Sequence, residues 1–478
     1  MTEHVDVLIV GAGLSGIGAA AQVRTRLPGK SVAVLESRGA SGGTWDLFRY
    51  PGIRSDSDMF TFSYHWRPWP SDTALADGEL ILDYVRTVAR EHRVDELIRY
   101  HHRVTAASWD SETARWTVTV DHDGETITMT AGLLWGCSGY YDYEQGYEPE
   151  FPGASSFRGQ LFHPQHWPEH LDYADKLVVV IGSGATAVTL VPAMAKDAAR
   201  VTMLQRSPTY ILSMPARDPV ARLLRGLPEK TKFSIVRWKN VLMQIATYQL
   251  ARRRPRLAKK LIHVATTKSL PEGFPVEEHF KPDYNPWEQR LCLVPDGDLF
   301  KALSDGSAEI VTDTIETFTE TGIRLSSGRE LEADIVVSAT GLKVLPFGGL
   351  KFEVDGRPVD LAQTMSYKAL MLSGVPNFIY TVGYANASWT LKADLVADYA
   401  CRLVEHLDKN GLRYAVPERD PSVAEKPFID FNSGYVLRAI EHMPKQGDRE
   451  PWLLKQNYVT DVRKIRRDDI DDGVLQFA

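Results

Sequence analysis

Two short loops of the chain carry glycines at the spacing that binds the pyrophosphate of a dinucleotide. The first loop is Gly11-Ala12-Gly13-Leu14-Ser15-Gly16, and the second is Gly182-Ser183-Gly184-Ala185-Thr186-Ala187, with Ala in the third position as this fingerprint allows. The glycines permit a sharp turn and a close approach of the backbone to the phosphates, and the following helix offers unpaired N–H groups. The sequence therefore predicts two dinucleotide sites.

The elements that must position these loops are also readable in the sequence. Apolar runs over residues 5–10 and 176–181 predict buried strands before the loops, and small residues over 17–23 predict a helix packed closely on a sheet. A strand over 31–35 ends at Glu36, where an acid accepts hydrogen bonds from a ribose hydroxyl, as is usual for FAD in proteins with two such loops. We therefore expect FAD at the first loop.

The second loop lacks such an acid. The strand that follows it ends at Gln205-Arg206-Ser207, and a guanidinium beside a hydroxyl suits the 2′-phosphate of NADPH. We expect NADPH rather than NADH, the alternative being that Arg206 is only a solvated surface residue.

Two further motifs lie outside the dinucleotide loops. Gly42-Gly-Thr44-Trp45 is followed by Arg49-Tyr-Pro-Gly-Ile-Arg54-Ser-Asp56, and Phe157-x-Gly159-x-x-x-His163-x-x-x-Trp167-Pro lies between the two loops. Both resemble motifs of the type I Baeyer–Villiger monooxygenases, flavoproteins that insert one oxygen atom of O2 beside a carbonyl. Flavin monooxygenases that oxidise heteroatoms usually end the second motif in Tyr or Phe, so Trp167 favours the first group.

The resemblance implies roles for particular residues. Thr44, Trp45, Arg54 and Asp56 would lie on the flavin side, and the backbone of Val104 would meet the adenine. Arg290 would be the catalytic arginine over the flavin, with Asp56 orienting it; the alternative is that Asp56 is only a turn residue. The family's lysine beside that arginine is Gln289 here, so recognition of the 2′-phosphate would rest more heavily on Arg206. We expect His163 to couple domain motion rather than transfer a proton.

The implied activity is conversion of ketones to esters by an FAD- and NADPH-dependent enzyme that also oxidises sulfides or thioamides. The nearest alternative is a flavin monooxygenase restricted to nitrogen or sulfur oxygenation. A flavin reductase or oxidase and a non-catalytic nucleotide sensor at a membrane are the others. The residues indicate neither the identity of the substrate nor an oligomeric state.

These motifs imply an α/β fold with two Rossmann-like domains. We expect an FAD domain built from residues 1–150 and 341–478, and an NADPH domain over 151–340 with a basic helical insertion at about 216–270. Residues 103–107 and 115–120 predict two strands of a small antiparallel insert, 133–139 and 334–341 predict strands that end in glycine, and 383–389 resembles the approach to a helix that faces the flavin. The aromatic residues after 427 have no motif that assigns them chemistry.

Composition bounds the class of protein. The 478 residues are 44% hydrophobic, and they include no apolar run of about eighteen residues and no signal peptide, so we expect a cytoplasmic globular protein. The three cysteines, Cys137, Cys292 and Cys401, are too far apart in the sequence to form a disulfide framework, a zinc site or a redox pair. We expect no metal and no nucleic-acid partner.

The charge is unevenly distributed along the chain. Residues 217–268 hold 14 Lys and Arg against two acids, a net charge of +12. Because the whole chain has a net charge of −7, the other residues together carry −19. Apolar residues at helical spacing predict that this segment is helical. We expect a lid or a packed helical pair with a solvated basic face, and peripheral membrane contact is the less favoured interpretation, compatible with the first.

Overall fold

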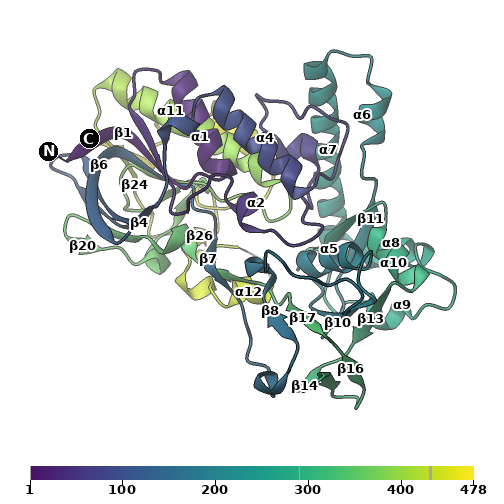
Figure 1. Cartoon of the computed structure of the whole chain (residues 1–478). Helices are drawn as coiled ribbons and strands as arrows, with labels where there is room; N and C mark the ends of the chain where they lie inside the picture. Colours follow the sequence, from purple (N-terminus) through teal and green to yellow (C-terminus); the bar gives the residue numbers. More distant parts are fainter. Residues whose placement is uncertain (1, 290, 430–432) are drawn as a thin grey trace.

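The two largest sheets among the described residues, of nine and five strands, are built around parallel strands (Figure 1). The computed structural model describes residues 2–289, 291–429 and 433–478. In the first sheet, β1 (Glu3–Val10) lies between β2 (Val32–Leu35) and β6 (Glu125–Gly136) and runs parallel to both. Its Val7 and Ile9 are buried in one core with α1 (Leu14–Arg26) and α11 (Trp389–Asn410), which pack together, whereas Val5 and Leu8 belong to the core on the other face of the sheet. The strand predicted over residues 5–10 is confirmed.

The first sheet gathers segments from both ends of the chain. β23 (Phe378–Tyr380) pairs parallel with β6, and β19 (Lys351–Val354) pairs parallel with β4 (His102–Asp110). β4, β5 (Arg115–His122) and β6 are antiparallel neighbours. The two strands predicted at residues 103–107 and 115–120 are confirmed, and they pair antiparallel as predicted. The long β6 joins them to the nine-stranded sheet.

The second sheet has five parallel strands in the order β13-β10-β9-β17-β8. Its strands are β8 (Gln160–Phe162), β9 (Leu177–Ile181), β10 (Arg200–Gln205), β13 (Ala308–Thr312) and β17 (Ile335–Ser338). The helices α5 (Ala185–Met194) and α10 (Asp298–Asp305) contribute to its core. The two Rossmann-like sheets predicted from the glycine loops are therefore confirmed.

Two segments connect the sheets, and they pair with each other. β7 (Tyr141–Gly146) follows the first sheet, β18 (Leu342–Val344) follows the second, and the two strands are antiparallel. Both passages of the chain between the sheets therefore run side by side and form one joint.

The basic segment is helical, as predicted. It contains α6 (Pro219–Leu223), α7 (Glu229–Arg253) and α8 (Pro255–Lys268), and α7 lies at the edge of the molecule in Figure 1. Although α8 contacts β11 (Ile211–Met214), α7 packs on α3 (Met59–Phe62), and its buried Phe233, Val236 and Val241 belong to the core of the first sheet. The insertion therefore spans both sheets. No helix among the described residues is long and apolar enough to cross a membrane.

Candidate active site

The first glycine loop turns sharply against the neighbouring strand. Gly11 has φ of +105°, and a Cβ there would lie 2.6 Å from the carbonyl oxygen of Cys137. At Gly16 a Cβ would lie 1.8 Å from the carbonyl oxygen of Gly11, so the helix can approach the turn only without a side chain. Gly13 is different, because the protein atom nearest to its Cβ position is 3.5 Å away. A side chain at Gly13 would therefore make only an ordinary contact with Gly43, so packing within the protein does not require a glycine there.

The N-terminus of α1 can bind a phosphate. Its N-cap is Gly13, and no side chain caps the helix, so the first N–H groups have no intrahelical partner. Such a terminus is a favourable position for an anion. The loop predicted from Gly11, Gly13, Ser15 and Gly16 therefore fits a pyrophosphate.

Glu36 lies at the carboxyl end of β2, beside the same loop. Its Oε2 accepts a hydrogen bond from the backbone N–H of Ala12 at 2.8 Å, and its Oε1 accepts one from Arg38 at 3.0 Å. Burial raises the pKa of this carboxyl, while the two backbone hydrogen bonds oppose the shift. The two contacts fix the acid beside the first glycine loop.

The second loop repeats this arrangement on the second sheet. Gly182 has φ of +135°, and a Cβ there would lie 2.4 Å from the carbonyl oxygen of Ala339. At Gly184, which precedes α5, no atom lies within 4 Å of the Cβ position, and no side chain caps the helix. The residues Ala185, Thr186 and Ala187 form the first turn of α5. This loop too fits a pyrophosphate.

Arg206 and Ser207 follow the end of β10, and both are exposed. The carbonyl oxygen of Ser207 accepts a hydrogen bond from the hydroxyl of Ser183 at 3.2 Å, and that hydroxyl also pairs with Thr209 at 2.7 Å. These contacts hold the second loop next to the strand end that carries Arg206. A cation there is free to reach a phosphate bound near the loop.

The Arg-Tyr-Pro-Gly motif lies where the first domain meets α5. Tyr50 hydrogen-bonds to Thr186, and burial raises the pKa of its hydroxyl to about 12. A Cβ at Gly52, which has φ of +76°, would lie 3.0 Å from the carbonyl oxygen of Thr189 and 2.7 Å from Ala193. The conformation and the close contact explain the glycine in the motif.

The expected flavin-side residues do not all lie in one place. Thr44, Trp45 and Asp56 line a single cavity, and the hydroxyl of Thr44 pairs with that of Tyr141. Arg54 instead forms an ion pair with Asp298 at 2.5 Å, at the start of α10. Its side chain therefore ties the motif to the second domain.

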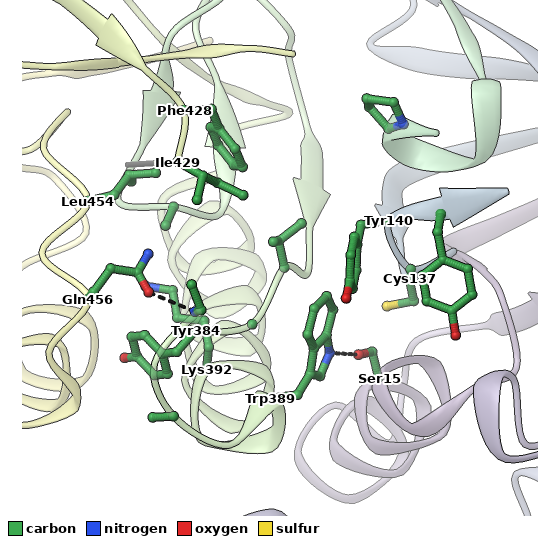
Figure 2. Close-up of a pocket in the computed structure, with 18 of the residues that line it drawn as sticks. Ser15, Cys137, Tyr140, Tyr384, Trp389, Lys392, Phe428, Ile429, Leu454 and Gln456 are labelled. Carbon is green, nitrogen blue, oxygen red and sulfur yellow. Dashed lines mark hydrogen bonds between the residues drawn. The ribbon is translucent and has the colours of Figure 1, made fainter. Parts of the chain in front are cut away.

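One cavity connects the first glycine loop with the C-terminal segment. It has about 2220 Å³ of empty space, part of it open to solvent, and its lining includes Gly13, Ser15, Thr44, Trp45 and Asp56. Figure 2 shows Tyr140 and Trp389 between Ser15 and a group of side chains from the C-terminal segment. The rings of Tyr140 and Trp389 are stacked with centroids 5.4 Å apart, and the indole N–H of Trp389 donates to Ser15 at 2.8 Å.

The far side of this cavity is mainly apolar. We call it the apolar lobe; it consists of Phe428, Ile429, Tyr435, Met443 and Leu454. The sequence contained no motif for these residues, and the only signal was the number of aromatic residues after 427. Trp389 could have been located from the helix that was expected near 383–389, since it is the first residue of α11.

The fingerprint motif lies at the joint between the sheets. His163 is 4% exposed; its Nε2–H donates to the carbonyl oxygen of Gly341 at 2.9 Å and its Nδ1 accepts from the N–H of Gln165 at 3.2 Å. With one nitrogen donating and the other accepting, the ring is neutral, and burial lowers its pKa. A Cβ at Gly146 would lie 2.1 Å from the ring, so His163 contacts both connecting segments.

The other fingerprint residues pack within the second domain. Phe157 meets Phe318 edge to face at 5.8 Å, and Trp167 meets Phe162 at 5.2 Å. A Cβ at Gly159 would lie 2.3 Å from the carbonyl oxygen of Asp334.

Two further residues that the sequence predicted for the site are Val104 and Arg290. Val104 is buried in β4, and nothing beside it distinguishes an adenine site from ordinary packing. Arg290 lies outside the described residues.

Comparison with known proteins agrees with this geometry. The model of the family "Flavin-binding monooxygenase-like" matches residues 53–351, and the NAD(P)-binding Rossmann-like domain model matches residues 9–69. The FAD-containing monooxygenase EthA of Mycobacterium tuberculosis strain H37Rv is 56% identical over 481 residues, covering 100% of this chain and 98% of that protein. The probable FAD-binding monooxygenase AlmA of Acinetobacter baylyi is 48% identical over 482 residues, covering 100% of this chain and 97% of that protein.

Solved structures share the fold. An oxidised steroid monooxygenase bound to NADP superposes with a TM-score of 0.73 at 24% identity, over 87% of this chain and 88% of that one. An open crystal structure of cyclohexanone monooxygenase superposes with a TM-score of 0.72 at 19% identity, over 88% of this chain and 90% of that one. With relatives of this identity along the whole chain and two loops that fit dinucleotides, the chain belongs to the flavin-binding monooxygenase-like family, as a flavoprotein monooxygenase with two dinucleotide-binding domains.

Proposed function

We propose that the chain is an FAD- and NADPH-dependent Baeyer–Villiger monooxygenase, which converts a ketone, O2, NADPH and a proton into an ester, water and NADP⁺. The observation that carries the proposal is the single cavity in which Asp56 and the first glycine loop face an apolar lobe. Such a cavity brings an apolar carbonyl compound to the cofactor. The fingerprint that ends in Trp167 supports this activity over oxygenation of nitrogen or sulfur alone.

The cofactor positions follow from the two loops. FAD binds at the first loop, with its pyrophosphate at the N-terminus of α1 and its ribose at Glu36, and NADPH binds at the second loop, with its 2′-phosphate at Arg206. When bound and reduced by NADPH, FAD supplies the activation of O2. The name of the relative EthA, "FAD-containing monooxygenase", supports FAD as the flavin cofactor.

The protein's own part in the reaction is positioning and electrostatics. The N-terminus of α11 begins at Trp389 on the cavity wall, and its positive end stabilises negative charge that develops there. Arg290 is a permanent cation suited to hold the developing oxyanion, and Asp56 orients it. His163 moves no proton in this scheme, because both of its ring nitrogens are used in holding the joint.

The same site oxygenates sulfur. A sulfide or thioamide needs no carbonyl to be held against the reacting oxygen, so its oxidation demands less of the site than ester formation does. We therefore include sulfides and thioamides among the substrates.

The decisive experiment is a panel of ketones and sulfides incubated with the FAD-loaded enzyme, NADPH and O2, with products identified by mass. Esters from ketones support the proposal. Sulfoxides without any ester would assign the chain to sulfur oxygenation alone. Hydrogen peroxide as the only oxygen product would assign it to the oxidases.

A further inference from the structure

The insertion carries most of the large apolar side chains that the molecule exposes. Of 13 such side chains among the described residues, ten belong to the segment 217–268. On α7, Ile235, Trp238 and Leu242 recur at helical spacing and are 44%, 43% and 56% exposed. On α8, Leu257 and Leu261 are also one helical turn apart, and they are 47% and 53% exposed. The further members are Leu223, Leu227, Met243, Leu250 and Val264. We call these ten side chains the apolar face.

The opposite side of α7 is fixed on the protein by polar contacts. Arg237, 5% exposed, donates to the carbonyl oxygens of Phe60 and Ser63, each at 2.8 Å. The amide of Asn240 donates to Asp58 at 2.7 Å. Because these buried contacts set the orientation of the helix, α7 cannot rotate to cover its apolar face. The exposure of these side chains therefore belongs to the folded state, and large apolar side chains that gather exposed on one segment mark a site of interaction.

The charge around the apolar face selects the partner. Arg253, Arg254 and Arg256, at the junction of α7 and α8, are exposed, as are Lys260 and Lys268. Residues 217–268 carry a net charge of +12, whereas the rest of the chain carries −19. An anionic surface therefore attracts the insertion and repels the rest of the protein. A second copy docked by the same face would bring two such cationic surfaces together, which is unfavourable. From this complementarity we propose that α6, α7 and α8 dock the enzyme peripherally on an anionic lipid bilayer, with the apolar face in the interface between headgroups and acyl chains.

A cavity beside α7 gives a second reason to expect docking on a bilayer. Tyr248 and Gln249 of α7 line it, and it shares Phe428, Ile429 and Leu454 with the cavity of the active site. Docking through α7 brings the boundary of the bilayer next to the apolar lobe, so an apolar substrate dissolved in lipid has a short path to the flavin. This last step rests on the proposed function, whereas docking itself does not.

The test is co-sedimentation of the FAD-loaded, full-length enzyme with phosphatidylglycerol-containing vesicles and with pure phosphatidylcholine vesicles. We expect binding to the anionic vesicles that weakens steeply with salt, and little binding to the neutral ones. The combined variant Arg253→Gln, Arg256→Gln, Lys260→Gln should bind about a hundredfold more weakly, since each cation near the surface contributes about fivefold.

The apolar face has its own variant and a matched control. Leu242→Gln, Leu257→Gln and Leu261→Gln together should abolish sedimentation, whereas Leu80→Gln, at a leucine 50% exposed on α4 (Gly78–Glu91), should not change it. Flavin absorbance and the thermal midpoint show that each variant is folded. Absence of binding to anionic vesicles, equal binding to neutral ones, or full binding by either triple variant overturns the proposal. A dimer that the leucine variant dissociates, with no vesicle binding, would assign the face to a second copy and overturn it as well.

Discussion

Arg237 of the insertion helix α7 and Asp394 of α11 form an ion pair, with 3.2 Å between Nη2 and Oδ2 and side chains only 6% and 1% exposed. The same carboxylate oxygen accepts a hydrogen bond from the backbone N–H of His65 at 2.9 Å. The contact joins the insertion to the long helix that begins at the cavity wall. The insertion therefore belongs structurally to the flavin domain as much as to the second domain from which it emerges.

The ion pair should matter for stability. Arg237→Met removes the charge and leaves Asp394 and several backbone carbonyl oxygens short of a donor in a buried place. We expect the free energy of unfolding to fall by about 3–5 kcal/mol, as when one partner of a buried pair is deleted. Denaturant unfolding measures the change. The control is Arg253→Met at an exposed position of the same helix, expected to change it by less than about 0.5 kcal/mol. Equal effects of the two substitutions would contradict this account.

The two kinds of glycine in the site predict opposite outcomes. Gly184→Ala puts a Cβ where no protein atom lies within 4 Å, so the fold should tolerate it while the approach of a pyrophosphate is blocked. We expect an unchanged thermal midpoint and an NADPH KM at least about tenfold higher, equivalent to about 1.4 kcal/mol. Gly52→Ala should instead lower the midpoint, because its φ is +76° and α5 is in contact. An unchanged KM for Gly184→Ala would remove the nucleotide from this loop.

Cofactor choice should depend on Arg206. Under the proposed function Arg206 binds the 2′-phosphate, which only NADPH carries, so Arg206→Ala should raise the NADPH KM far more than the NADH KM. A lost charge-assisted bond of about 1.5–3 kcal/mol corresponds to roughly ten- to more than hundredfold. Steady-state kinetics with both cofactors measure the difference. Arg200→Ala, at the exposed opposite end of β10, is the control. A similar rise for both cofactors would leave Arg206 as a solvated surface residue.

The parts of the site that the sequence predicted are those with local signals. Gly11 and Gly182 lie within short strand-loop-helix units, and Glu36 ends the next strand, 24 residues from its partner Ala12, so each position belongs to one short βαβ pattern. The contact of Trp389 with Ser15 joins residues 374 apart in the chain, and no pattern at either residue indicates the other. The apolar lobe is similar, because its residues converge only when the C-terminal segment folds across the flavin domain.

The insertion shows a second limit of the sequence. Its helical period and charge were predictable, but the period does not tell which side of α7 is buried. The structure buries Arg237 and Asn240 and exposes Trp238 and Leu242, because the buried polar groups find partners on the flavin domain. Those partners come from distant segments, so a lid with a solvated basic face was the natural expectation, and the large apolar exposure was not foreseen.

The buried histidine at the joint predicts a pH dependence. Burial lowers the pKa of His163 below its ordinary value of 6.5, so the unfolded chain binds a proton more readily than the folded one. The stability associated with the neutral ring is thus complete above pH 6.5 and is lost as the pH falls through that value toward the folded pKa. His163→Gln should lose less stability between pH 7 and pH 5.5 than the parent does, as followed by thermal midpoints at both values. If the parent and His163→Gln lose the same stability between pH 7 and pH 5.5, protonation of His163 does not contribute to the pH dependence.

The proposed chemistry is tested most directly at Arg290. If Arg290 holds the developing oxyanion and Asp56 orients it, both act after hydride transfer. Arg290→Ala should therefore bind FAD and be reduced by NADPH at near the parent rate, yet form ester about a hundred- to a thousandfold more slowly, the usual loss when one positioned donor is removed from such a site. NADPH consumption should continue with release of hydrogen peroxide. Asp56→Asn, which keeps the size of the side chain and removes its charge, should show the same pattern more weakly. Rapid-reaction spectra of flavin reduction, together with ester yield, separate the two halves of the reaction. A variant that reduces slowly has lost cofactor binding instead, and one that forms ester at the parent rate shows that the oxyanion is held by another residue.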